Sequence, residues 1–253
     1  MLMPTLTFAL IFWPGVFFTS ADAAEVRVAV AANFLATFNE MVPVFEQRTG
    51  DTVLISPGST GKLYVQIKNG APFDVFFAAD SKRPRLLEEE GIAVKHSRFT
   101  YAVGRLTLWS ADPALIRGNG KSVLDKGSFT HLALANPKTA PYGRAAQQTL
   151  KALRLWDHVK DRLVQGENIG QAFQFVASRN AQLGFVALSQ VLDPKINGAG
   201  SRWDVPATLY DPLEQQVVLL KKGQKNAVAI ALLEYVKGEK GRAAIKRFGY
   251  GLD

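Results

Sequence analysis

Cysteine is absent from this chain of 253 residues. The absence excludes a disulfide framework, a thiolate metal site, an iron–sulfur cluster and a catalytic cysteine. Histidine is scarce, and the 3 histidines, His96, His131 and His158, lack the spacing of metal ligands, so a zinc site built from histidine is not expected. The hydrophobic fraction of 47% and the charged fraction of 21% are those of a globular chain with a sizeable core, which excludes intrinsic disorder and collagen-like repeats.

Acidic residues are the minority among the charged side chains. The 22 Asp and Glu stand against 30 Lys and Arg, for a formal net charge of +8. Such an excess raises the question of nucleic-acid binding. The basic residues follow no nucleic-acid-binding motif, however, and the group at 237–247 has the pattern of the solvated face of a terminal helix. We therefore expect no nucleic-acid partner.

Charged residues are also missing from 1–20, where 6–18 form an apolar run broken by a threonine, a proline and a glycine. This run is too short and too interrupted to span a bilayer. The alanines within 21–24 have the −3, −1 pattern of a signal peptidase site, so 1–24 is predicted to be a cleaved signal peptide. A membrane anchor or a disordered leader stays open, because the segment has no Lys or Arg. Without cysteine no thioether-linked lipid anchor is expected, which favours free diffusion in a periplasm.

Strand and helix signals alternate along the remaining chain. Apolar, β-rich runs predict strands at 25–32, 52–59, 73–79, 131–137, 162–166, 183–189 and 216–221. The helical spacing of apolar residues predicts helices at 33–50, 60–70, 143–153, 170–179, 227–237 and 240–248. A long apolar and β-branched run at 98–110 separates two groups of these elements. Near-continuous apolar strands between helices are typical of parallel sheets covered on both faces, so two α/β lobes are expected.

Four of the predicted helices begin with small, hydroxyl, amide or glycine residues. The junctions are Ala32-Asn33, Ser59-Thr60-Gly61, Pro141-Tyr142-Gly143 and Asn168-Ile169-Gly170. Helix N-termini expose unpaired N–H groups and a partial positive charge, so several that meet at the carboxyl ends of strands would bind an anion without any lysine. Ordinary N-caps use the same residue types. The junctions by themselves therefore leave an anion site and simple helix capping both open.

Enzyme motifs fit the same residues poorly. The segment 58–62 has the end of a phosphate-binding loop, but two further positions of that motif hold other residues. Ser59 lies in no G-x-S-x-G motif and has no histidine adjacent in sequence. Asp74 and Asp80 flank a predicted strand, where a carboxylate is more typical of a turn or cap than of a catalytic pair. We expect no enzyme and no catalytic residue; a secreted hydrolase that uses Ser59 or Asp74 is the alternative.

Five segments carry a resemblance to a known family, in order and in spacing: 28–38, 55–80, 135–146, 167–173 and 183–190. They include Asn-Gly-Ala-Pro-x-Asp-Val-Phe at 69–76 and Asn-Pro-x-x-Ala-Pro-Tyr-Gly at 136–143. Over nearly all of 25–253 the chain resembles the molybdate-binding periplasmic proteins of ABC importers. The resemblance implies an inner-membrane ABC permease complex as the partner, a monomer, and no cofactor.

The resemblance also implies an α/β fold of the two-lobed type II periplasmic binding protein class. Each lobe would be a mostly parallel sheet flanked by helices, and two hinge crossings would join the lobes. We assign 25–102 and 220–253 to the first lobe and 103–219 to the second. The ligand cleft would lie between them.

Carried over by position, the family's site implies four molybdate-binding residues: Asn33, Thr60, Tyr142 and Ile169, with Ala32 and Ser59 as secondary candidates. Family members differ at positions 32 and 187, which hold alanine here, and the Ser59 hydroxyl would replace a missing donor. A fully deprotonated dianion needs only donors, whereas phosphate keeps a proton near neutral pH and needs an acceptor. Sulfate also needs only donors, so a receptor for another tetrahedral oxyanion is the alternative. Molybdate and tungstate are not distinguished, and no metal cation is expected.

Overall fold

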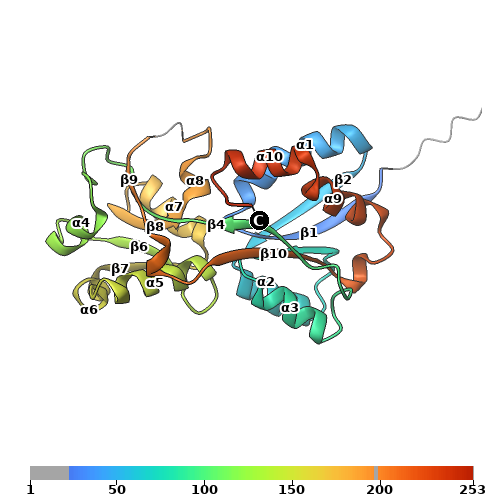
Figure 1. The fold of residues 1–253 in the computed structure, drawn as a ribbon, viewed down its shortest axis with the longest axis horizontal. Helices are drawn as coiled ribbons and strands as arrows, with labels where there is room; N and C mark the ends of the chain where they lie inside the picture. The colour runs from blue at the N-terminus through green and yellow to red at the C-terminus, as the bar shows by residue number, and fades with distance from the viewer. Residues whose placement is uncertain (1–22, 197–198, 253) are drawn as a thin grey trace, which may run out of the picture.

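The computed structural model describes residues 23–196 and 199–252. They form two lobes that lie side by side, and each lobe is built on one five-stranded sheet flanked by helices (Figure 1). The predicted signal peptide lies outside the described residues except for its last two positions. Among the described helices, none is long and apolar enough to cross a membrane.

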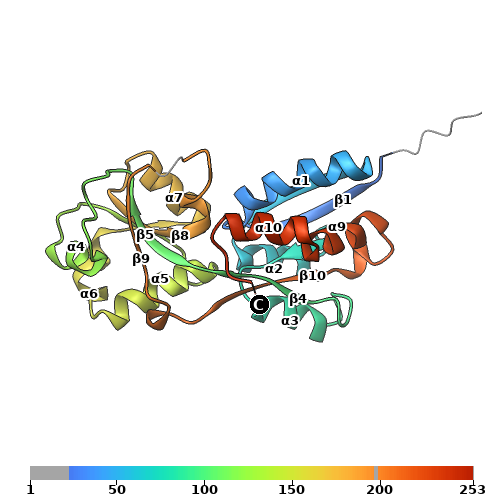
Figure 2. The same cartoon turned by 45° about the horizontal axis from the view of Figure 1, so that its top comes forward.

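The first lobe has the sheet order β2-β1-β3-β10-β4. Its strands are β1 (Glu25–Ala31), β2 (Thr52–Gly58), β3 (Val75–Phe77), β4 (Phe99–Gly104) and β10 (Leu213–Leu219). Its helices are α1 (Leu35–Thr49), α2 (Thr60–Lys68), α3 (Lys82–Glu89), α9 (Ala227–Lys237) and α10 (Glu239–Arg247), with a 3-10 turn at Lys221–Gly223. One apolar core joins α1, α9 and α10 to one face of the sheet, and a second joins α2 and α3 to the other (Figures 1 and 2).

The second lobe has the sheet order β7-β6-β8-β5-β9. Its strands are β5 (Leu106–Ser110), β6 (Leu132–Ala135), β7 (Leu163–Gly166), β8 (Leu183–Ala187) and β9 (Ser201–Asp204). Its helices are α4 (Gly120–Lys126), α5 (Pro141–Ala152), α6 (Trp156–Val159), α7 (Ile169–Ala177) and α8 (Leu188–Val191), with 3-10 turns at Lys160–Arg162 and Ala207–Leu209. The predicted two-lobed α/β architecture is therefore confirmed.

Both sheets are mixed, which corrects the expectation of mostly parallel sheets. In the first sheet β1 pairs in parallel with β2 and β3, whereas β10 pairs antiparallel with β3 and β4. In the second, β6 pairs in parallel with β7 and β8, whereas β5 pairs antiparallel with β8 and β9. The physical reason is the connection between the lobes. Strands β5 and β10 each enter their sheet from the other lobe, so they run opposite to neighbours that end at the cleft.

The strand pairing also corrects the expected lobe boundaries. The chain crosses between the sheets twice, at Arg105 between β4 and β5 and at 205–212 between β9 and β10. The predicted single run at 98–110 is thus two strands, one in each lobe. Residues 213–219 pair with β3 and β4, so they belong to the first lobe and not to the second. An apolar strand has the same pattern in either sheet, so its sequence does not reveal which neighbours it pairs with.

Parallel pairing brings the starts of four helices, those that follow β1, β2, β6 and β7, to the cleft. Strands β1 and β2 end at the same edge of the first sheet, and β6 and β7 end at the same edge of the second. The chain continues from these four ends toward α1, α2, α5 and α7. Gly143 permits the close approach of α5, because a Cβ at this position would lie 2.2 Å from the carbonyl oxygen of Ala135. The two edges face each other across the cleft.

Candidate binding site between the lobes

A small cavity lies between the lobes where these four chain segments turn into helices. The space open to the centre of a water-sized sphere is about 10 Å³, so the cavity suits a compact group and no extended molecule. Its walls come from both lobes and consist of Ala31, Ala32, Asn33, Gly58, Ser59, Thr60, Ala79, Ala140, Pro141, Tyr142, Asn168 and Ile169.

All six residues carried over from the family resemblance line this cavity: Ala32, Asn33, Ser59, Thr60, Tyr142 and Ile169. Sequence reasoning did not assign the other lining residues to the site. Most of them are direct neighbours of the six in sequence, a signal that could have found them. Ala79 is different, because it follows β3 without opening a helix, and only the position of β3 beside β1 brings it to the cavity.

Several backbone N–H groups in the lining of the cavity are unpaired. Within 23–196 and 199–252, no group accepts a hydrogen bond from the backbone N–H of Asn33, Ser59, Thr60, Tyr142 or Ile169. Such groups are left over by the first turn of a helix, and the helix dipole adds a partial positive charge at the same place. The cavity is thus lined by donors that are available to an anion.

Ala32 contributes a wall and no donor. Its backbone N–H donates to the carbonyl oxygen of Gly58 at 2.9 Å, and its side chain is a methyl group. Ala187, the second alanine at which the family varies, is fully buried and does not line the cavity.

Two hydroxyl groups extend the set of donors. Ser59 is only 4% exposed, and its Oγ has no hydrogen-bond partner in the described part of the chain. Although Ser59 is the N-cap residue of α2, its side chain makes no capping bond. The Thr60 Oγ1 accepts from the Ala79 N–H at 3.0 Å, which leaves its own O–H to donate. Asn168 behaves differently, because its side chain caps α7 by accepting from the Gln171 N–H at 3.0 Å.

The Asn33 side chain points away from the cavity. Its amide nitrogen donates to Gln215 Oε1 at 2.7 Å and to the Tyr250 hydroxyl at 3.1 Å, so both of its N–H bonds are used in the interior. The backbone N–H is therefore the donor that Asn33 offers to the cavity, and a side-chain contact with a ligand is not supported.

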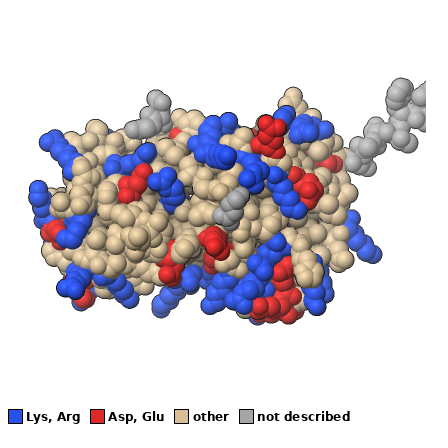
Figure 3. Space-filling model, in the orientation of Figure 1, with Lys and Arg blue, Asp and Glu red and all other residues tan. Residues whose placement is uncertain are grey.

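Charged side chains are absent from the described lining of the cavity. The carboxylate next to it in sequence, Asp80, is paired with Arg83 and lies 3.8 Å from Arg144. On the face drawn in Figure 3, Lys and Arg are instead scattered over the outside of both lobes, among uncharged residues and some Asp and Glu. The cavity therefore attracts negative charge through helix starts and hydroxyl groups, without a carboxylate that would favour a protonated ligand.

Contacts between the lobes surround the cavity. The Gly61 N–H at the start of α2 donates to the carbonyl oxygen of Thr139 at 2.8 Å. Lys62 forms an ion pair with Glu167, and the Ser189 hydroxyl donates to the carbonyl oxygen of Asn33 at 3.0 Å. The structure thus has its two lobes in direct contact on several sides of the site.

Known proteins resemble this chain in both sequence and fold. Residues 26–251 match the family model of the bacterial extracellular solute-binding proteins. The chain is 54% identical to the molybdate-binding protein ModA of Azotobacter vinelandii, with 94% of each chain covered. The chain belongs to this family of solute-binding proteins, together with ModA. It is also 46% identical to ModA of Rhodobacter capsulatus, over 91% of this chain and 89% of the relative.

Solved structures agree with the fold. The periplasmic molybdate-binding protein of Azotobacter vinelandii superimposes with a TM-score of 0.87 and 44% identity, over 90% of this chain and 99% of that one. The sulfate-binding protein SubI of Mycobacterium tuberculosis shares the fold with a TM-score of 0.75 but only 10% identity, over 90% and 86% of the two chains. Membership of the family confirms the prediction that this chain is a solute-binding protein and not an enzyme. The fold alone does not select one oxyanion.

Three buried tyrosines near the cavity predict a loss of stability at high pH. Burial raises the pKa of Tyr101 and Tyr142 well above the ordinary value and raises the pKa of Tyr250 to about 12. These phenols have a pKa near 10 in the unfolded chain. Their contribution to the free energy of unfolding is therefore fully present below pH ~10 and is lost as the pH rises through about 12. We expect the free energy of unfolding, measured by urea denaturation, to fall over this interval. Tyr250→Phe should reduce the slope; an unchanged slope would contradict the assignment.

Proposed function

We propose that this protein binds molybdate, and also tungstate, as the solute receptor of an ABC importer. The observation that carries the proposal is the cavity itself, in which unpaired N–H groups and a free hydroxyl from both lobes meet without any carboxylate. The identity to molybdate-binding ModA proteins supports the same ligand.

The chemistry of the donors favours a fully deprotonated dianion. Each oxygen of molybdate or tungstate only accepts hydrogen bonds, and the cavity offers backbone N–H groups and hydroxyls and no carboxylate. Phosphate carries a proton near neutral pH and would find no carboxylate to accept it; a hydroxyl that accepts this proton no longer serves only as a donor to the anion, which costs affinity. Sulfate meets the same donors as molybdate, so its exclusion depends on how well the smaller ion fills the space.

Binding is coupled to closure of the lobes because the donors are divided between them. Ser59 and Thr60 would hold the anion from the first lobe, and Tyr142 and Ile169 from the second. Asn33 would add its backbone N–H. An anion that bridges the lobes stabilises the closed form by the contacts that only this form completes. The closed form would then be the one that the inner-membrane permease recognises.

Isothermal titration of the mature protein with molybdate, tungstate, sulfate and phosphate tests the proposal. Molybdate and tungstate should bind with similar affinity. Sulfate should bind at least about 100-fold more weakly because the smaller ion cannot reach all the donors at once, and phosphate because its proton has no carboxylate to accept it; each unmatched buried group costs about 1–3 kcal/mol. The absence of heat with molybdate, or sulfate binding of equal strength, would rule out this ligand. The cleaved signal peptide, the lack of a lipid anchor and the monomeric state stay predictions, which mass spectrometry and light scattering of the secreted protein would check.

A further inference from the structure

Buried polar side chains form a connected network behind the cavity, with Gln215 at its centre. Gln215 is 0% exposed and lies on β10. Its Oε1 accepts from the Asn33 amide at 2.7 Å and from the Tyr101 hydroxyl at 2.9 Å. Its Nε2 donates to the Tyr142 hydroxyl at 2.9 Å. One side chain therefore contacts two residues of the proposed site, one from each lobe.

We infer that Gln215 is a positioning residue, which links Asn33 to Tyr142 and stabilises the closed lobes through the Tyr142 hydroxyl. The inference rests on the proposed function, because it assigns the role of Gln215 within the same site. Its bonds to Asn33 and Tyr101 lie inside the first lobe and do not depend on closure. Its bond to Tyr142 joins the lobes and forms only when they meet.

The backbone at the first crossing leaves room for this bond. Gly104, the last residue of β4, lies so close that a Cβ there would be 2.2 Å from the Tyr142 hydroxyl oxygen and 2.4 Å from Gln215 Nε2. Its φ is not in the left-handed region, so alanine is allowed by the backbone and is excluded by the neighbouring side chains. The glycine thus keeps the space in which the bond between the lobes forms.

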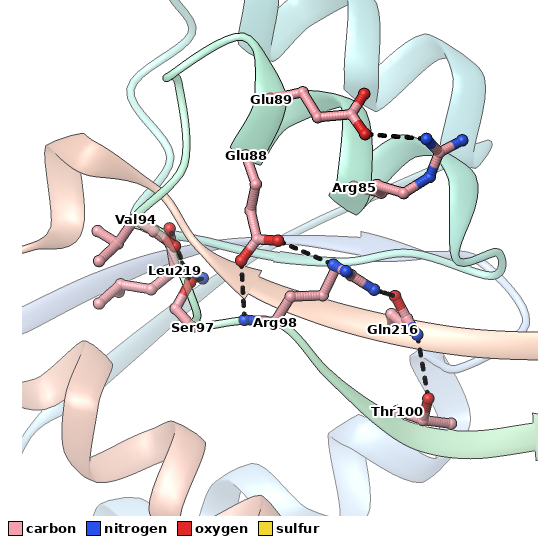
Figure 4. Close-up of polar contacts among 9 residues, drawn as sticks. All are labelled: Arg85, Glu88, Glu89, Val94, Ser97, Arg98, Thr100, Gln216 and Leu219. Atoms are coloured by element: carbon pink, nitrogen blue, oxygen red, sulfur yellow. Dashed lines mark hydrogen bonds and ion pairs between the residues drawn. The ribbon is translucent and has the colours of Figure 1, made fainter.

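The next residue of β10 holds the strand in place on its lobe. The pairing of β10 with β4 shifts register between Gln215 and Gln216, a bulge that leaves Tyr101 unpaired in the ladder. Gln216 Oε1 accepts from Arg98 at 2.7 Å, and its Nε2 donates to the Thr100 hydroxyl at 3.1 Å (Figure 4). Arg98 is held in turn by Glu88 of α3 at 2.9 Å. Gln215 therefore projects toward the second lobe from an anchored strand.

Two tyrosine variants form a matched test, because each removes one buried hydroxyl bonded to Gln215. Tyr142→Phe keeps the backbone N–H proposed to bind the anion and deletes the bond between the lobes. We expect a dissociation constant for molybdate about tenfold higher, through a faster dissociation rate and an unchanged association rate. Tyr101→Phe removes a hydroxyl whose two acceptors, Gln215 Oε1 at 2.9 Å and the Ala78 carbonyl oxygen at 3.2 Å, both lie in the first lobe. We expect it to lower the stability of the ligand-free protein and to change the affinity by less than about twofold.

Gly104→Ala supplies a second test that removes no polar group, and it should also accelerate dissociation of molybdate. Calorimetry and stopped-flow kinetics with molybdate measure both effects. Equal changes in the two tyrosine variants, or a slower association rate in place of faster dissociation, would overturn the role of Gln215. Should the wild-type protein bind sulfate and no molybdate, the proposed ligand is wrong, while the same comparison with sulfate still decides whether Gln215 stabilises the closed lobes.

Discussion

Gly61→Ala is expected to weaken molybdate binding on the order of 10- to 100-fold and to stabilise the ligand-free protein. Gly61 is the second residue of α2, and the closed lobes press its backbone against Thr139. A Cβ at Gly61 would lie 2.8 Å from the Thr139 carbonyl oxygen and 3.0 Å from its Cα. These are backbone atoms of the other lobe, so relief requires the lobes to separate, and overpacking of this kind costs roughly 1–3 kcal/mol.

The gain in stability has a separate origin. Glycine within a helix costs roughly 0.5–1 kcal/mol relative to alanine, and an open form places nothing from the second lobe against α2. Titration calorimetry and thermal unfolding of the ligand-free protein measure the two effects. Gly170→Ala is the matched control, because it has the same position in α7. Its methyl group would lie 3.0 Å from Asn168 Oδ1 in its own lobe, and its contact with the other lobe, 3.5 Å from the Ala32 Cβ, is an ordinary one. A similar loss of affinity in both variants would exclude a steric block specific to Gly61.

Ser59→Ala is expected to reduce the affinity for molybdate by about 1.5–3 kcal/mol, or roughly 10- to 150-fold, with no loss of folding stability. The Ser59 hydroxyl is buried and has no partner among the described residues, so the folded protein loses no internal hydrogen bond when it is removed. A charged oxygen in the cavity would lose a donor that water does not replace. Calorimetry and urea denaturation separate the two quantities.

Thr107→Val provides the opposite control. Thr107 is buried in β5, away from the cavity, and its hydroxyl donates to the Trp203 carbonyl oxygen at 3.0 Å. Its loss should lower the free energy of unfolding by about 1 kcal/mol and leave the affinity for molybdate unchanged. If Ser59→Ala instead destabilises the fold and binds molybdate normally, the hydroxyl is structural and does not face the ligand.

Sequence reasoning predicted the location of the candidate site well, because a helix start is a local feature. The change from a strand pattern to a helical one marks Ser59 and Tyr142 without any knowledge of the fold, and the cavity contains both. Local pattern was less informative about pairing. The apolar strand at 213–219 belongs to the first lobe, and Ala79 reaches the cavity only through the neighbours of β3.

The sequence by itself determined that four helices begin with unpaired N–H groups and that no lysine or carboxylate stands at these junctions. The first turn of any helix leaves its N–H groups unpaired, so this feature follows from local sequence. Tertiary structure alone decided which polar side chains remain free at those ends. Asn168 caps its own helix, whereas Ser59 does not. Asn33 is held by the side chains of Gln215 and Tyr250, which lie 182 and 217 residues further along the chain. Contacts over such separations depend on how two lobes meet, and no local pattern of residues encodes them.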